Sequence, residues 1–182
     1  DHENPSATAL RQMIEAGTDW QRYVPNSTCF EDAAVHALQY GERAVLARLR
    51  TMTDEEFETL PFGTEGLWRK LMHAARQEAT LEKIITAAKS KRYTRTRLDR
   101  MVMCAFLGIT EQMLSSAAPY VRVLAFNDRG REILHYAKKA GNLINIGERV
   151  DHSYQQLEDR CGTLYGLFTQ SPEAPDRESR YR

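Results

Sequence analysis

The stretch Lys89-Ser90-Lys91-Arg92-Tyr93-Thr94-Arg95-Thr96-Arg97-Leu98-Asp99-Arg100 carries six basic side chains and one acidic side chain in twelve residues. A wholly apolar run over residues 101–107 follows it directly. This pattern predicts one helix over residues 93–107, with an apolar half buried in the domain centre and basic first turns that emerge from the core. Helical spacing would place Tyr93 beside Arg97 and Thr96 beside Arg100. The face that we expect to be buried consists of Leu98, Met101, Val102 and Ala105.

Basic, hydroxyl and aromatic side chains on one rigid element suit a phosphate backbone with accessible bases. Arginine makes bidentate contacts to phosphate, hydroxyls donate to phosphate or sugar, and a ring can stack on a base. The alternative is a solvated helix start whose arginines pair with local acids. From the residues alone, the two interpretations stand about equal.

The charge of the whole chain limits what that stretch can do. The 182 residues have a formal net charge of zero and a pI of about 7.1, so a nucleic-acid site must be a local patch. Three widely spaced cysteines without a CxxC pair argue for a reducing cytoplasm and against a disulfide framework or zinc site. No apolar run approaches the roughly 18 residues of a membrane span, and there is no signal peptide. We therefore expect a cytoplasmic protein without a membrane contact.

The first helix is expected over residues 5–18, with Ser6 as its N-cap and Gly17 as its C-terminal stop. Ser6 and Thr8 lie in its first turn, and Arg11 follows one turn later. Free N–H groups and the helix dipole favour an anion at such an end, which makes it a possible phosphate site. The alternative is that Ser6 only caps the helix.

Residues 26–118 predict a bundle of short and medium helices joined by short loops. Gly41 is expected to separate two of these helices, and Pro61-Phe62-Gly63 to end a third. Threonines are the expected caps of most of the others. The expected helices cover residues 30–40, 43–52, 53–60, 64–76, 80–90, 93–107 and 110–117.

The pattern becomes β-rich after Pro119. Residues 120–126 and 142–146 predict two short strands, and residues 129–139 a helix between them, preceded by a turn or a helix start at residues 127–130. This order predicts a small βαβ unit with parallel strands, in which Ile133, Leu134 and Tyr136 face inward. A last helix is expected over residues 152–168, and a frayed tail after Gln170. The fold class is therefore mainly α with a small α/β element: a helical bundle, a short βαβ unit and a C-terminal helix.

The sequence holds no complete catalytic site. It has no HIGH-like element, no phosphate loop and no GxGxxG motif. Its five histidines show no spacing typical of metal ligands. No serine or cysteine lies in a nucleophile-elbow context. We therefore assign no catalytic and no metal-binding residue to this chain, and an enzymatic function would need a further part.

Four stretches together resemble the bacterial tRNA(Met) cytidine acetate ligases. Residues 5–11, PSATALR, are similar to the SATxIR segment of that family, and residues 65–67 to its EGL helix start. Residues 91–101, KRYTRTRLDRM, resemble its KRYTxTRLxRM signature, with Arg95 where an aromatic residue is common. Residues 118–124, APYVRVL, followed by Gly130, match its APYxRxL…G segment. Order and spacing agree from about residue 5 to residue 140, and the likeness is loose beyond about residue 145.

The resemblance implies an enzyme that uses ATP with Mg to adenylate acetate and transfers the acetyl group to N4 of the wobble cytidine of elongator tRNA(Met). Adenylation would take place mainly in an N-terminal α/β domain that carries the HIGH-type motif. This chain would be the C-terminal part, a fragment inactive alone and without a bound cofactor. The implied organisation is residues 1–25 as last helix and linker of the missing nucleotidyltransferase-like domain, 26–118 as a helical domain, 119–170 as a βαβ-plus-helix subdomain and 171–182 as a flexible tail.

The resemblance also implies the site residues and the partners. Ser6, Thr8 and Arg11 would line the nucleotide-phosphate edge. The partners would be tRNA and the missing catalytic domain, and the sequence does not tell the oligomeric state. The residues expected to contact RNA are Lys89, Lys91, Arg92, Tyr93, Thr94, Thr96, Arg97, Arg100 and Arg122, with Tyr93 either stacking on a base or ordering Arg97.

Two other interpretations stay open. A structural helical domain without RNA contact would pack its basic signature against the missing domain, with Arg97 or Arg100 paired to buried acids. A related nucleotidyltransferase with another acceptor is the third. Exposure of Lys91, Arg92, Arg97 and Arg100 on one face would favour RNA. Burial in ion pairs with Glu65, Asp99 or Asp128 would favour the structural interpretation.

Overall fold

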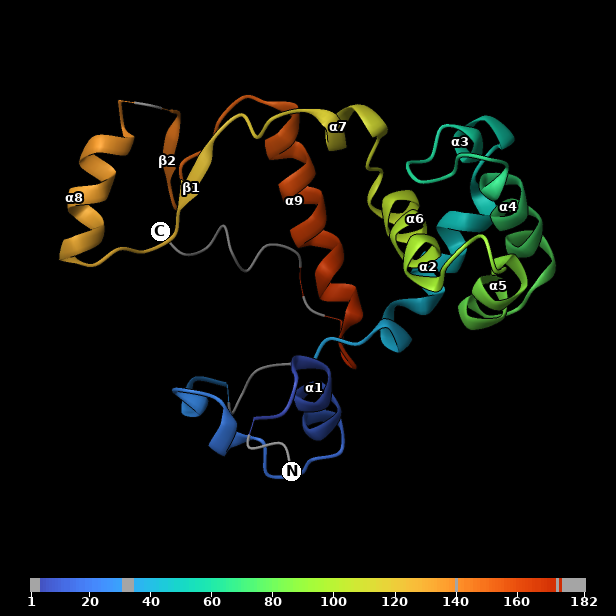
Figure 1. Ribbon diagram of the computed structural model, residues 1–182, viewed down its shortest axis with the longest axis horizontal. Helices are drawn as coiled ribbons and strands as arrows, with labels where there is room; N and C mark the ends of the chain where they lie inside the picture. Colours follow the sequence, from blue (N-terminus) through green and yellow to red (C-terminus); the bar gives the residue numbers. More distant parts are fainter. Residues whose placement is uncertain (1–3, 31–34, 140, 173, 175–182) are drawn as a thin grey trace.

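The computed structural model describes residues 4–30, 35–139, 141–172 and 174 (Figure 1). The described part is mainly helical with one two-stranded parallel sheet, as expected. Helices α2 to α6 gather at one end, the β1–α8–β2 unit lies at the other, and α7 and α9 lie between them (Figure 1). The helices of the first end are α2 (Leu38–Thr51), α3 (Asp54–Glu58), α4 (Leu67–Gln77), α5 (Leu81–Ala88) and α6 (Arg95–Leu107), and α7 spans Glu111–Ser115.

The remaining elements flank this group of helices along the sequence. Helix α1 and two 3-10 turns precede it, and they lie apart from it in Figure 1. No described residue of α1 is buried. The bounds are α1 (Ala7–Glu15), η1 (Gln21–Tyr23), η2 (Ser27–Phe30), β1 (Val121–Val123), α8 (Asp128–Ala137), β2 (Leu143–Asn145), α9 (Ser153–Tyr165) and η3 (Gly166–Phe168).

Helix α6 is the centre of the core. Its four predicted core residues, from Leu98 to Ala105, are all buried, which confirms the expected face. They pack in one cluster with side chains of α2, α3, α4 and α5. The helix begins later than predicted, at Arg95, because Thr94 has an extended backbone and its hydroxyl accepts from the Arg97 N–H at 3.4 Å. Residues 89–93 therefore precede the helix and do not form its first turn.

Helix α2 corrects the expectation of two helices separated at Gly41. It runs without a break from Leu38 to Thr51, and residues 35–37 before it are not helical. Gly41 is buried, and a Cβ built there would lie 2.6 Å from the Phe168 ring of η3. This glycine therefore serves a close approach between two segments and not a helix end. Residues 31–34, part of the expected first segment, lie outside the described residues.

Most predicted caps are confirmed. Ser6, Thr53, Thr80 and Thr110 each accept a backbone N–H of the helix that follows. The exception is α4, which does not open at Thr64. It begins at Leu67 after Gly66, whose φ of 80° is left-handed, and no side chain caps it. The reason is that Thr64 contacts Arg97, as described below.

The β1–α8–β2 unit has the predicted order with parallel strands, in the register Val121↔Leu143 to Val123↔Asn145. Residues 127–130 are a helix start, since the Asn127 side chain accepts from the Gly130 N–H at 2.9 Å. The expected inward face of α8 is wrong for two residues: Ile133 is 65% and Tyr136 73% exposed. Two strands of three residues each offer too little surface to cover a helix stripe. The predicted last helix consists of α9 and η3, and most of the predicted frayed tail lies outside the described residues.

No helix among the described residues is long and apolar enough to cross a membrane.

We predict that Gly41→Ala lowers the free energy of unfolding by about 1–3 kcal/mol, because the added methyl group overpacks against Phe168. Urea denaturation would measure the change. The control is Gly162→Ala in α9, where an added Cβ meets nothing within 4 Å and alanine is the better helix former. A Gly41→Ala protein as stable as the control would contradict the close approach of η3 to α2.

Candidate nucleic-acid interface

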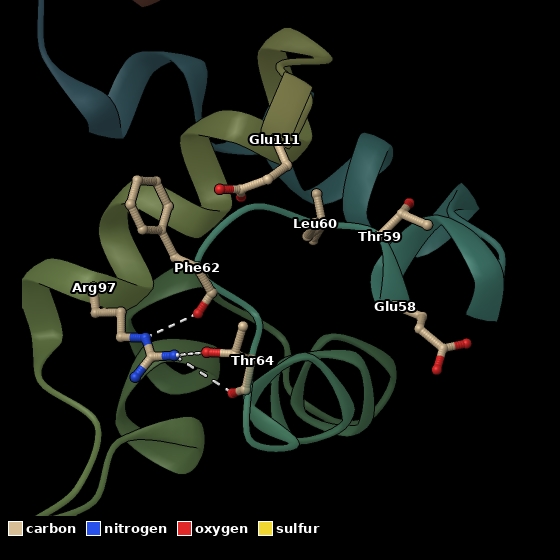
Figure 2. A pocket seen from close by; sticks show the side chains of 7 residues that line it. All are labelled: Glu58, Thr59, Leu60, Phe62, Thr64, Arg97 and Glu111. Atoms are coloured by element: carbon tan, nitrogen blue, oxygen red, sulfur yellow. Dashed lines mark hydrogen bonds between the residues drawn. The ribbon is translucent and has the colours of Figure 1, made fainter. Parts of the chain in front are cut away.

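Arg97 joins the signature helix to the loop before α4. Its Nε donates to the Phe62 carbonyl at 2.8 Å, and its Nη2 donates to the Thr64 hydroxyl at 2.7 Å (Figure 2). Within this loop, Phe62 and Glu65 both have left-handed backbones, with φ of 65° and 62°. Such conformations are unfavourable for residues other than glycine, so the surrounding contacts must hold them. Arg97 is therefore a structural anchor of the loop.

Tyr93 lies beneath the same loop. It is only 5% exposed, and its hydroxyl donates to the Glu65 carbonyl at 2.6 Å. The Arg97 guanidinium lies 5.5 Å from the centre of its ring. Of the two expected roles of Tyr93, this geometry favours ordering Arg97, because a ring buried in this way offers no free face to a base.

The Glu65 carboxylate holds two of the signature arginines. It contacts Arg92 at 2.8 and 3.1 Å and Arg97 at 3.8 Å. The hydrogen bond from Arg92, and then the charges of Arg92 and Arg97, hold the pKa of Glu65 below its usual value. These are ion pairs of the kind that the structural interpretation expected, but they lie at the surface, since the Arg92 side chain is 65% exposed.

The other basic residues of the stretch divide into one paired residue and three unpaired ones. Arg95 contacts the carboxylates of Glu82 and Asp99. Within the part of the chain that the structure describes, no acid lies within 4 Å of the other three basic side chains. All three are exposed, as are the two threonines of the stretch, Thr94 and Thr96. The unpaired residues, which we call the open cations, are Lys89, Lys91 and Arg100.

Beside Arg97, the structure has an open depression of about 570 Å³ (Figure 2). Helix α3, the loop before α4, α6 and α7 all contribute to it. Its two glutamates make it unsuited to a phosphate group. The lining residues are Glu58, Thr59, Leu60, Phe62, Thr64, Arg97 and Glu111.

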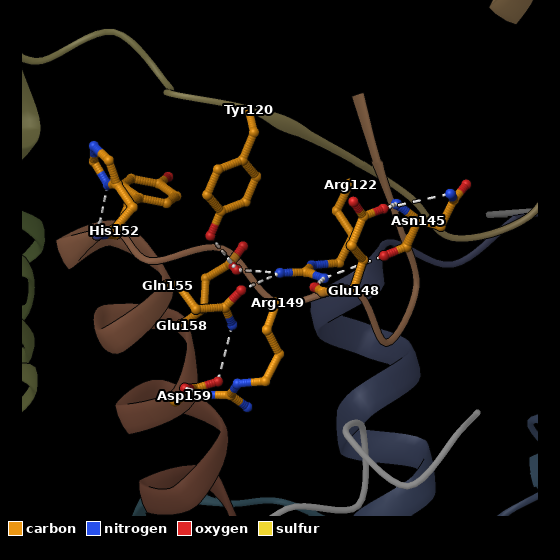
Figure 3. Close-up of polar contacts among 10 residues, drawn as sticks. Tyr120, Arg122, Asn145, Glu148, Arg149, His152, Gln155, Glu158 and Asp159 are labelled. Atoms are coloured by element: carbon orange, nitrogen blue, oxygen red, sulfur yellow. Dashed lines mark hydrogen bonds and ion pairs between the residues drawn. The ribbon is translucent and has the colours of Figure 1, made fainter. Parts of the chain in front are cut away.

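Arg122 has a different environment from the one we expected. Its side chain is 20% exposed and donates to the Glu148 carbonyl at 2.9 Å, to Gln155 at 2.8 Å and to Glu158 at 3.0 Å (Figure 3). The Tyr120 hydroxyl donates to the same Glu158 carboxylate at 2.6 Å. Burial and this carboxylate raise the pKa of Tyr120. Both terminal nitrogens of Arg122 donate within the chain and join β1 to α9. This geometry favours a structural role over the expected RNA contact.

The expected nucleotide edge lies on α1. The Ser6 hydroxyl accepts from the Ala9 N–H at 3.2 Å and so caps the helix. Thr8 and Arg11 are exposed. Their contact with a nucleotide stays a prediction. Among the described residues, no group of three histidine, cysteine or acidic side chains could hold a metal ion.

Sequence reasoning missed two features of this interface. One is Lys70 on α4, whose Nζ lies 5.4 Å from the centre of the Tyr93 ring. The other is the loop at residues 61–66, which was predicted as a helix break at residues 61–63 followed by the start of the next helix. The resemblance to the EGL helix start pointed to this loop, but not to its contact with Arg97.

The chain matches the family model described as HIGH Nucleotidyl Transferase over residues 1–180, and it belongs to that family. This match includes the N-terminal region of the chain, so it does not support the narrower assignment to a C-terminal part. It also continues well past residue 145, where the motif likeness became loose.

Curated relatives carry the name tRNA(Met) cytidine acetate ligase. The protein of Alkaliphilus metalliredigens is 37% identical over 137 residues, which cover 71% of this chain and 32% of the relative. The protein of Limosilactobacillus reuteri is 30% identical over 172 residues, which cover 90% of this chain and 46% of the relative. The chain thus spans between a third and a half of the length of these relatives.

Two solved structures show the same fold. The apo crystal structure of Thermotoga maritima TmcAL matches with a TM-score of 0.80 and 21% identity, and covers 98% of this chain and 49% of that chain. The structure of the same protein bound with alpha-thio ATP matches with a TM-score of 0.76 and 22% identity, and the match covers 96% of this chain and 50% of that chain.

We predict that Tyr93→Phe lowers the free energy of unfolding by about 0.5–1.5 kcal/mol, because it removes the hydrogen bond to Glu65 but keeps the ring. The affinity for RNA should stay unchanged. Urea denaturation and a binding titration would measure the two quantities. Tyr136→Phe is the control, since that side chain is 73% exposed. Loss of RNA binding at unchanged stability would show instead that the Tyr93 hydroxyl contacts RNA.

Proposed function

We propose that this chain is the tRNA-facing part of an ATP-dependent ligase that acetylates the wobble cytidine of elongator tRNA(Met) through an acetyl-adenylate. The observation that supports this most is the exposure of the open cations, Lys89, Lys91 and Arg100, none of which has an acid within 4 Å in the described chain. Exposed cations without internal partners are free to take phosphates. The name shared by the relatives supplies the substrate and the reaction.

In this proposal the chemistry is divided within the whole enzyme. The HIGH-type motif is not in these 182 residues, so adenylation of acetate would take place on another part of the protein. Residues 1–25 would form the edge of that part, where Ser6, Thr8 and Arg11 face the phosphates of ATP bound with Mg. Residues 26–118 would be the helical RNA-facing domain, residues 119–170 a supporting subdomain and residues 171–182 a tail. The cytoplasmic location stays a prediction.

The signature residues would have two kinds of role. The open cations contact the RNA backbone directly, and the hydroxyls of Thr94 and Thr96 lie beside them in the sequence. Tyr93 and Arg97, from the same stretch of sequence, hold the loop before α4 instead. This division follows from which side chains are engaged within the chain and which are exposed.

A specific observation also favours the second candidate, a structural domain without RNA contact. Arg92 and Arg97 pair with Glu65, one of the acids that this interpretation named, although the pairs lie at the surface. It does not explain the open cations, none of which has an acid within 4 Å in the described chain, although the charge of Lys89 helps to lower the pKa of Glu82. The two candidates therefore differ in what the open cations do.

The test is the double variant Lys91→Glu/Arg100→Glu, titrated with tRNA(Met) across a salt series. Two lost phosphate contacts should weaken binding and reduce the salt slope by about two. The control is Lys138→Glu/Lys139→Glu, the same charge change at the end of α8. Arg97 is left in place because its reversal would release the loop. Equal affinities and slopes for the two double variants would support the structural candidate.

A further inference from the structure

Three cations lie near the buried ring of Tyr93. Besides Arg97 at 5.5 Å from the ring centre, Lys70 lies at 5.4 Å and Arg92 at 5.8 Å. We propose that Lys70, Arg92 and Arg97 form a phosphate subsite next to the open cations. This inference rests on the proposed function and adds to it a residue outside the signature, Lys70, and the chemical class of its ligand.

The charges of this cluster do not balance. Glu65 is the carboxylate that contacts Arg92 and Arg97, and Lys70 has no acid within 4 Å in the described chain. Three positive charges thus face one negative charge. Arg95 shows the contrast, since two acids contact its single guanidinium. The surplus around Tyr93 is what an anion would neutralise.

The start of α4 adds to this surplus. Lys70 lies in the first turns of α4, which has no acid in its first turn and no side-chain cap at Gly66. The positive end of the helix dipole disfavours a lysine and favours an anion there. A Cβ built on Gly66 meets nothing within 4 Å, so the space in front of this helix start is open.

Glu65 would be a weak competitor for this position. The Arg92 and Glu65 side chains are 65% and 46% exposed, and ion pairs between exposed groups contribute little free energy. A phosphate group offers more acceptor oxygens to Arg92 and Lys70 than one carboxylate does. Arg97, whose Nε and Nη2 already donate to Phe62 and Thr64, would add its charge and its Nη1. The rigid ring of Tyr93 keeps the cations together before the ligand arrives, which lowers the entropy cost of binding.

The phosphate could belong to the RNA backbone or to a nucleotide. The test therefore measures the affinity of the 182-residue chain for tRNA(Met) and, separately, for ATP, with Lys70→Gln, Glu65→Gln and the control Lys138→Gln. Lys70→Gln should weaken binding of the ligand severalfold, and for tRNA lower the salt slope by about one. Glu65→Gln should strengthen binding, because it removes the competing carboxylate. The control should bind like the original chain.

Each outcome decides the inference. Opposite effects of Lys70→Gln and Glu65→Gln on tRNA alone assign the subsite to the RNA backbone, and on ATP alone to a nucleotide. If neither substitution changes either affinity while Lys91→Glu/Arg100→Glu still weakens tRNA binding, the subsite is wrong and the proposed function stands. If the original chain binds neither ligand at low salt, both are overturned. Thermal unfolding of Lys70→Gln and of Glu65→Gln separates a change in binding from a loss of folding.

Discussion

Burial of the apolar face of α6 is the constraint on which the rest of this structure depends. Leu98 and Met101 on that face are fully buried in the core cluster. A helix fixed along one face also fixes the direction of its other faces, so the position of Arg97 follows from the packing of its neighbour Leu98. Through Arg97, the same burial holds the loop before α4. The basic surface is therefore part of a rigid frame.

The electrostatics follow from this frame. A chain with no net charge keeps a positive region by pairing only some of its cations. The pKa of Glu65 is lowered by Arg92 and that of Glu82 by Arg95. Carboxyl groups with lowered pKa values stabilise the folded chain above their unfolded pKa, and this contribution is lost as the pH falls through the folded pKa. Both pairs are exposed, so salt weakens them, while the unpaired cations stay free for a ligand.

The features that could be predicted from the sequence are those that neighbouring residues determine, such as helix caps. Most of the threonine and serine caps were correct because a cap needs only a hydroxyl and the next few N–H groups. Gly41 was misread as a helix end because its partner, Phe168, is far along the chain. The contacts of Arg122 were not predicted because its acceptors lie on α9 and after β2. Contacts between distant segments leave no periodic signal, so the fold class could be predicted and the environment of single arginines could not.

The signature itself shows why a motif match cannot assign roles residue by residue. Tyr93 and Arg97 belong to the same short segment as Lys91 and Arg100, yet the first two are engaged within the chain and the last two are exposed. One short segment therefore carries two kinds of residue, those that hold the loop before α4 and those that expose a positive charge. Lys70 lies outside the segment and shares the Tyr93 ring. The surface that meets a phosphate is therefore defined by charge balance in space, and only partly by the motif.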